Sequence, residues 1–323
     1  MWARVPAPSD RTMLRLGVAS LAANMVIVVT GGAVRLTGSG LGCPRWPRCS
    51  DGSFVPHGEL GYHGFVEFSN RMLTFVLAVV VIATWVAAMR LTPARRSVRV
   101  LATVMALGVP AQALLGGVTV LTDLNPWIVA GHLLVSLAIV GVCVVFLRRL
   151  QEGDEPPRPA MRSGLVWLAR ITFGAAWLVL YAGTVVTGSG PHAGDTDAPR
   201  TGLDPRAMSQ VHADLVFLLV GLTLGCLLAL RAADVPERAV RAAGWLLAVE
   251  LAQGSVGFVQ YFTGLPVVLV GFHLLGASAV SACATWLLLG TRSRGARRPA
   301  VGTPGSAVKP GSPRPHEVSD RVK

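Results

Sequence analysis

The feature that most constrains the fold is a series of eight apolar segments, each about long enough to cross a bilayer. They lie at about residues 13–34, 64–89, 99–121, 127–147, 163–187, 208–230, 239–262 and 266–290. A helix needs about 20 apolar residues to span the hydrocarbon. No segment alternates like a barrel strand, and backbone groups cannot stay unpaired in lipid. Hydrophobic residues make up 52% of the 323 and charged residues 14%. We therefore predict an all-α integral membrane protein with eight transmembrane helices.

Loop charges predict the orientation. Twenty-two Lys and Arg residues lie at the two termini and in the even-numbered loops, whereas five lie on the opposite side. The positive-inside rule places both termini in the cytoplasm, with the protein in the cell membrane. The net charge of +12 is thus a topology signal, and we expect no nucleic-acid partner.

The eight segments form two similar halves. We expect a cytoplasmic N-terminus at 1–12, a four-helix bundle at 13–148, a cytoplasmic linker at 149–162, a second four-helix bundle at 163–290 and a disordered basic tail at 291–323. Thr37–Gly40 and Thr187–Gly190 repeat the sequence TGSG after the first helix of each half. Each half has an even number of spans, so the halves insert in the same orientation. We predict tandem bundles related by a pseudo-two-fold axis along the membrane normal.

One polar pattern occurs in both halves. Gln112 precedes His132 by 20 residues, and Gln253 precedes His273 by the same spacing. A further position aligns Asn70 of the first half with His212 of the second half.

His132 and His273 lie roughly 10 Å into the fourth and eighth helices from the outer side, and Asn70 and His212 lie at the outer ends of the second and sixth. Histidine is expensive inside a membrane, so we interpret His132, His212 and His273 as ligands that grip a haem between facing helices. The alternative is a set of interhelical hydrogen bonds. Zinc is disfavoured, because two histidines with no nearby Cys or carboxylate in the second half are too few.

Glu67 is a carboxylate inside the second span. It precedes Asn70 by three residues and Arg71 by four, so the three share one helix face. It either neutralises Arg71 or transfers protons beside a substrate, and the two roles can coexist. We expect His63, one turn earlier, to face solvent.

Two of the five cysteines, Cys43 and Cys49, lie together in the first outer loop. Outside the cytoplasm they can form a structural disulfide that stiffens a lid over the first half. A redox-active pair or two free thiols are the alternatives. Cys143, Cys226 and Cys283 lie in apolar spans and are interpreted as small core residues.

Several of these segments together resemble bacterial haem A synthases. The first outer loop, GGAVRLTGSGLGCP at residues 31–44 followed by Trp46–Pro47 and Cys49, is similar to the corresponding loop of that family. The remaining markers are EFSNR at 67–71 and the histidines in Gly131–His132, Val211–His212 and Phe272–His273. The resemblance covers residues 13–290.

The resemblance implies an enzyme that oxidises the C8 methyl group of haem O to a formyl group, giving haem A for cytochrome oxidase. It implies a haem b cofactor held by His212 and His273, and a first half that binds the substrate. There Glu67 is the implied acid/base and His132 the ligand of the substrate iron.

Arg35 and Arg71 are candidates to bind the substrate propionates. Many family members have His where this chain has Asn70, and a carboxamide is a poor iron ligand. We therefore expect one strong protein ligand on the substrate iron.

The expected partners are haem O, the lipid bilayer, a haem O synthase and an electron acceptor. The alternative function is a membrane cytochrome b that only transfers electrons, but this does not account for Glu67 or the closed outer loop. A transporter built from parallel repeats predicts unwound helices at the midplane, whereas the polar groups here lie nearer the surface.

Overall fold

The computed structural model describes residues 7–56 and 61–295. Each of the eight apolar segments forms one long helix there, and each is long and apolar enough to cross a membrane. The helices are α1 (Asp10–Leu36), α2 (Gly61–Met89), α3 (Arg96–Leu121), α4 (Pro126–Gln151), α5 (Ser163–Ser189), α6 (Pro205–Ala232), α7 (Glu237–Phe262) and α8 (Val267–Gly290). The predicted all-α fold with eight spans is confirmed, and the chain is a multi-pass membrane protein.

Local sequence sets several helix starts. Asn125 caps α4 by accepting a hydrogen bond from the backbone N–H of Trp127 at 3.0 Å, and Pro126 follows at the first helical position. Asp204 and Pro205 start α6 in the same way. Proline lacks the backbone donor that the first turn of a helix leaves unpaired, so it is well suited to these positions.

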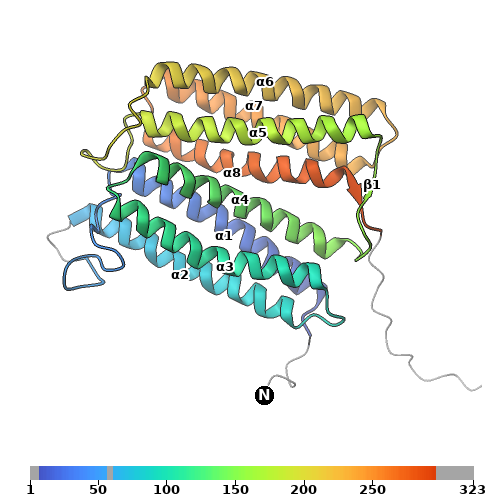
Figure 1. Cartoon of the computed structure of the whole chain (residues 1–323), viewed down its shortest axis with the longest axis horizontal. Coiled ribbons are helices and arrows are strands. Elements are labelled where there is room, and N and C mark those ends of the chain that lie inside the picture. The colour runs from blue at the N-terminus through green and yellow to red at the C-terminus, as the bar shows by residue number, and fades with distance from the viewer. Residues whose placement is uncertain (1–6, 57–60, 296–323) are drawn as a thin grey trace, which may run out of the picture.

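The helices form two groups of four lying side by side (Figure 1). Each helix of α1–α4 packs against its neighbours in a closed ring, and α5–α8 form a second ring. Between the groups, α8 contacts α1 and α4, and α5 contacts α4. The proposed pseudo-two-fold relation and the domain boundaries stay predictions.

Small residues allow the two groups to approach. A Cβ atom on Gly32 of α1 would collide with Leu274 of α8, and one on Gly141 of α4 would lie 3.0 Å from Thr285 Oγ1. Ser281 of α8 donates a hydrogen bond to the carbonyl of Leu137 at 2.8 Å. Small side chains and hydroxyl bonds are typical of helix packing in membranes, where the hydrophobic effect does not drive association.

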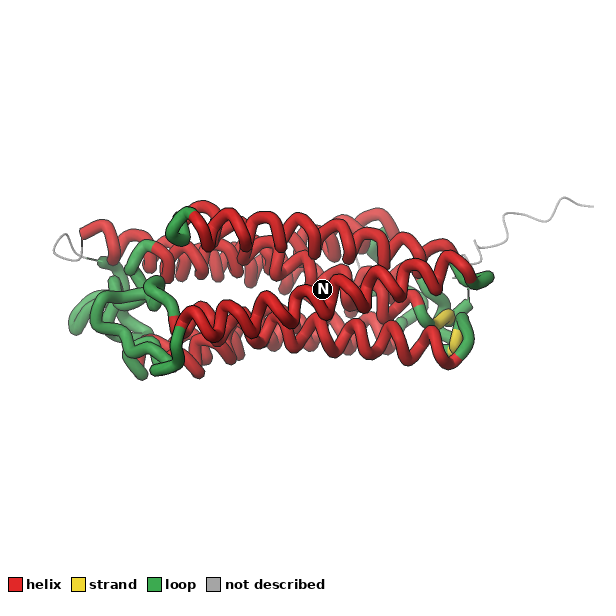
Figure 2. The backbone as a smooth tube through the Cα atoms, turned by 90° about the horizontal axis from the view of Figure 1, so that it is seen from above, coloured by secondary structure: helices red, strands yellow, loops and turns green. Residues whose placement is uncertain are grey.

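The two ends of the molecule differ. The long loops at 37–56 and 190–204 gather at one end, here called the loop end, and the segment between the two groups lies at the other, the linker end (Figure 2). At the linker end Arg95 pairs with Asp154 at 3.0 Å, and Arg149 pairs with Glu152 at 3.3 Å.

The linker also pairs with the segment after α8. Strand β1 (Arg158–Pro159) pairs antiparallel with β2 (Arg292–Ser293). The expected tail at 291–323 therefore begins with a short ordered segment, and its remainder from 296 lies outside the described residues.

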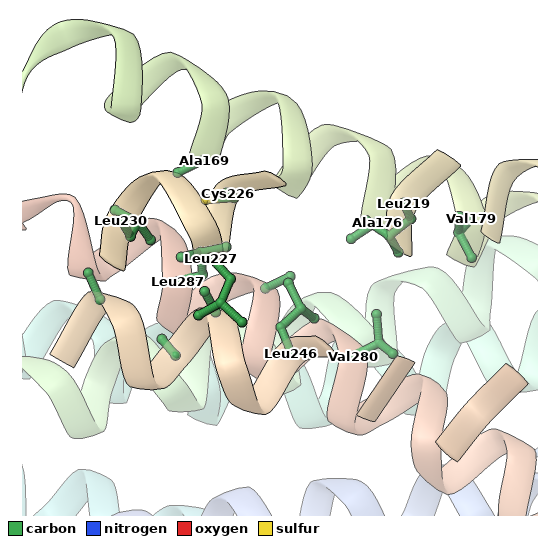
Figure 3. Close-up of a cluster of buried hydrophobic side chains, with 14 of the residues drawn as sticks. Ala169, Ala176, Val179, Leu219, Cys226, Leu227, Leu230, Leu246, Val280 and Leu287 are labelled. Carbon is green, nitrogen blue, oxygen red and sulfur yellow. The ribbon is translucent and has the colours of Figure 1, made fainter. Parts of the chain in front are cut away.

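The largest buried apolar cluster fills the α5–α8 group (Figure 3). Leu219 and Leu227 from α6, Leu246 from α7 and Leu287 from α8 belong to it. A smaller cluster around Met105 and Phe146 fills the α1–α4 group at the linker end. These cores fix the relative positions of the helices that carry the polar residues described next.

Candidate functional site

His212 of α6 and His273 of α8 face one another in the α5–α8 group. Their ring centres are 6.4 Å apart, and the ring planes cross at 76°. A metal–imidazole bond is about 2 Å long, and the ring centre lies about 1 Å beyond the bonding nitrogen. Two imidazoles on opposite sides of one metal ion therefore have ring centres about 6 Å apart. The spacing of this pair matches that arrangement.

The repeated Gln–His spacing corresponds to the same interhelical bond in both groups. Gln253 Nε2 donates to the backbone carbonyl of His273 at 2.8 Å, and Gln112 Nε2 donates to the carbonyl of His132 at 3.1 Å. Each glutamine thus fixes the backbone that carries a histidine. The sequence located this pair, and the structure gives the contact that explains its spacing.

A glycine lies against each of the three histidine rings. A Cβ atom on Gly116 would lie 3.4 Å from His132 Cε1, and one on Gly257 would lie equally close to His273 Cε1. A Cβ on Gly183 would lie 3.2 Å from His212 Cε1. A larger residue in place of any of these glycines would crowd the neighbouring imidazole ring.

One ring nitrogen of each histidine is buried without a partner. Among the described residues, Nδ1 of His132, His212 and His273 makes no hydrogen bond. A buried polar atom without a partner is costly, so these atoms call for a ligand or a bound group. Imidazole nitrogens are common ligands of haem iron, and the spacing of the His212 and His273 rings fits such a group.

Glu67 is almost fully buried, with 6% of its surface exposed. Its Oε1 accepts hydrogen bonds from Arg71 Nη2 at 2.5 Å and Nε at 3.1 Å. Its Oε2 accepts one from the backbone N–H of Cys43 at 2.7 Å. The predicted Glu67–Arg71 pair is therefore present, and the carboxylate is also bonded to the outer loop.

The outer loop is closed by a disulfide between Cys43 and Cys49, as we predicted from their position. Arg71 donates from Nη2 to the carbonyl of Cys43 at 3.0 Å and from Nη1 to that of Arg48 at 3.1 Å. The indole of Trp46 packs so closely on Gly117 of α3 that no side chain fits there. The loop therefore contacts both α2 and α3. On α3 it contacts Gly117, which is next to Gly116, the glycine that lies against His132.

Asn70 faces α1. Its Oδ1 accepts a hydrogen bond from Thr30 Oγ1 at 2.8 Å. The amide oxygen therefore has a protein partner. His63, one turn earlier than Glu67, is exposed as expected, and its Nδ1 lies 3.0 Å from Ser39 Oγ.

Arg35 connects the two groups at the loop end. Its Nε donates to the carbonyl of His192 at 2.8 Å, and its Nη2 donates to that of Thr187 at 3.1 Å. The backbone N–H of Gly40 bonds the carbonyl of Gly194 at 2.8 Å. Sequence spacing gave no sign of these contacts, because their partners are backbone atoms of the other half.

Residues 14–199, more than half of the chain, match the family profile COX15-CtaA, described as cytochrome oxidase assembly protein. The chain belongs to this family. Two relatives named Heme A synthase, from Bacillus cereus (strain 03BB102) and Bacillus anthracis, are each 27% identical over 300 residues, covering 87% of this chain and 94% of theirs. A Heme A synthase from Lysinibacillus sphaericus (strain C3-41) is 29% identical over 181 residues, covering 55% of this chain and 58% of its own. Membership of this family agrees with the resemblance to haem A synthases that the outer loop and the histidines indicated.

Our sequence reasoning missed a second buried carboxylate. We expected no carboxylate near the histidines of the second half, but Glu250 of α7 lies one helical turn from Gln253. It is 3% exposed, and its Oε1 accepts a hydrogen bond from Thr223 Oγ1 of α6 at 2.9 Å. The signal was present in the sequence, because a lone acidic residue in the middle of an apolar span indicates a functional position.

We expect replacing both Cys43 and Cys49 by Ser to lower stability by ~2 kcal/mol, because a short loop restricts the unfolded chain only modestly. Haem A formation should fall more than haem retention, since the closed loop donates a hydrogen bond to Glu67 and accepts hydrogen bonds from Arg71. Thiol labelling tests the bond itself. Denatured but unreduced protein should label only the three other cysteines, Cys143, Cys226 and Cys283. Labelling of all five would contradict the disulfide.

Proposed function

We propose that this chain is a haem A synthase, which oxidises the C8 methyl group of haem O to a formyl group and so supplies haem A for cytochrome oxidase. The observation that carries the proposal is Glu67. This carboxylate is buried inside a membrane span, is bonded to a disulfide-closed outer loop, and lies in the same group of helices as His132. Membership of the family and the relatives named Heme A synthase support it.

In this proposal the α1–α4 group binds haem O. His132 holds the substrate iron, and the loop around Trp46 keeps water from the loop end. Arg35 and Arg71 provide positive charge for the propionates. Among the described residues, Nη1 of Arg35 makes no hydrogen bond, so this nitrogen can serve a propionate oxygen.

Glu67 is the residue that we assign to proton transfer. A carboxylate can accept about four hydrogen bonds, and Glu67 accepts two at Oε1 and one at Oε2. A proton can therefore be held at Oε2 without displacing Arg71. Converting a methyl group to a formyl group releases protons together with electrons, so a base at this position assists the reaction.

The α5–α8 group would hold haem b through His212 and His273. When bound, such a haem supplies one-electron redox chemistry between the substrate and an external electron acceptor. The protein's part is to hold both rings at fixed spacing, through Gln253 and the glycines beside the rings.

The loop charges favour the cell membrane with both termini in the cytoplasm, which places the disulfide loop outside. Haem O carries a long apolar tail and reaches the site from the bilayer. A haem O synthase is the expected supplier of the substrate, and an electron acceptor is the other expected partner.

The decisive experiment is pigment extraction from cells that make haem O, with and without this protein. We expect haem A only when the protein is present. Bound haem with haem O left unchanged would instead favour an electron-transfer cytochrome b.

Asn70→His should add a second imidazole to the substrate iron. Because Asn70 is the repeat equivalent of His212, we expect substrate-loaded protein to gain a low-spin signal in absorption and electron paramagnetic resonance spectra. Turnover should fall, since an iron held on both sides is less free to react.

The matched control for this variant is Thr30→Val, which removes the hydrogen bond to Asn70 without adding a ligand. This control should gain no low-spin signal. An unchanged spectrum for Asn70→His would mean that residue 70 does not face the iron.

A further inference from the structure

Glu250 and Thr223 form a polar pair inside an apolar core. Leu246 lies one turn before Glu250 on α7, and Leu219 and Leu227 lie one turn on either side of Thr223 on α6. All three leucines belong to the buried cluster of Figure 3. Carboxylates inside membranes are rare and are associated with proton transfer, so this pair needs an explanation.

The two oxygens of Glu250 differ. Oε1 accepts the hydrogen bond from Thr223, whereas Oε2 is buried and makes no hydrogen bond among the described residues. No ion pair with Glu250 occurs within residues 7–56 and 61–295. If Glu250 served only to form a hydrogen bond between α6 and α7, one uncharged oxygen would be enough. A threonine or an asparagine could supply that oxygen. The second oxygen is therefore free to bind a proton.

Glu250 is connected to the histidine pair through Gln253. It precedes Gln253 by three residues, or about 4.5 Å along α7, and Gln253 is bonded to the backbone of His273. Of the other ionisable groups, the thiol of Cys283 on α8 interacts electrostatically with Glu250, and the thiol of Cys226 on α6 lies in the same buried cluster as Leu246. On α7 itself the nearest cation is Arg241, more than two turns away towards the linker end.

The α1–α4 group has no counterpart of this pair. The offset of 141 residues that relates Gln112 to Gln253 places Val109 at the position of Glu250. The offset of 142 that relates Asn70 to His212 places Val81 at the position of Thr223. Val81 is fully buried in its own apolar cluster. The carboxylate is thus specific to the group that carries the facing histidine pair.

We propose that Glu250 is a proton-binding site coupled to the redox state of the haem held by His212 and His273. The inference rests on the proposed function, because it needs that haem. Glu250 binds one proton from solvent at Oε2 as the iron gains one electron from a one-electron reductant. The O–H bond that forms at Oε2 replaces one O–H bond of a hydronium ion, which is left as water, and oxidation of the iron returns the proton to solvent. The physical reason is charge balance, because an electron added in a low-dielectric interior favours uptake of a proton nearby.

The test is a redox titration of the bound haem in purified full-length protein over a range of pH, with soluble one-electron mediators. In the unmodified protein we expect the midpoint potential to fall as pH rises. Glu250→Gln keeps the shape and the bond to Thr223 but cannot take the proton, so its midpoint potential should lose this pH dependence. Glu237→Gln, on the exposed first turn of the same helix, is the matched control and should behave like the unmodified protein.

An unchanged pH dependence in Glu250→Gln overturns the proposal. If that variant does not fold, redox-induced infrared difference spectra of the unmodified protein decide. A protonated carboxyl band should appear on reduction and shift in Thr223→Val, and its absence overturns the proposal. An unchanged pH dependence in Glu250→Gln would leave the haem A assignment untouched. Absence of haem from the α5–α8 group would overturn both.

Discussion

Glu67→Gln should lower haem A formation about 100-fold or more, the usual range for loss of a positioned acid or base. The substitution is nearly isosteric, and its amide oxygen can still accept from Arg71, but it cannot take a proton. The protein should still fold and bind haem in the α5–α8 group. The measurement is haem A extracted from cells that make haem O, normalised to the amount of protein and to its low-spin haem.

The matched control is Arg71→Gln, which breaks the ion pair with Glu67 and the bonds to the outer loop but leaves the carboxylate. If Glu67 transfers protons, Arg71→Gln should retain more haem A formation than Glu67→Gln. Haem A formation at the level of the unmodified protein in Glu67→Gln, with the protein still folded, would reduce Glu67 to a structural partner of Arg71.

The helices were predictable because lipid offers the backbone no hydrogen-bonding partners. An apolar segment of this length must satisfy its backbone internally, so the span at about 13–34 could only become a helix such as α1. Its true bounds, Asp10–Leu36, extend further because polar ends such as the Ser9 cap continue the helix beyond the hydrocarbon. Hydropathy does not record such extensions.

The site was predictable only where residue type carries the signal. Histidines at repeated spacing and two cysteines in an outer loop indicate chemistry by their identity. The partners of Arg35 are backbone carbonyls of the opposite half, at His192 and Thr187, and no sequence pattern encodes them. Glu250 is visible in the sequence, but its repeat equivalent is Val109, so the repeated polar pattern does not include it.

The two histidines of the α5–α8 group are held by different elements. His273 is fixed by Gln253 from α7, and His212 lies against Gly183 of α5. Removing either imidazole leaves the other in place, so each single variant tests one of the two proposed ligands. This separation makes the pair more informative than a double variant, in which loss of haem would not identify the ligand.

His212→Ala and His273→Ala should each remove the low-spin haem signal of the purified protein. Loss of an axial ligand leaves five-coordinate, high-spin iron or no haem, and the loss of affinity should exceed the roughly 10–100-fold effect of outer-sphere changes. Absorption and electron paramagnetic resonance spectra, with haem content per protein, measure both outcomes. His132→Ala is the matched control, since His132 has the same glutamine and glycine neighbours in the other group and should leave this signal intact. A low-spin signal that survives in both single variants would place the haem ligands elsewhere.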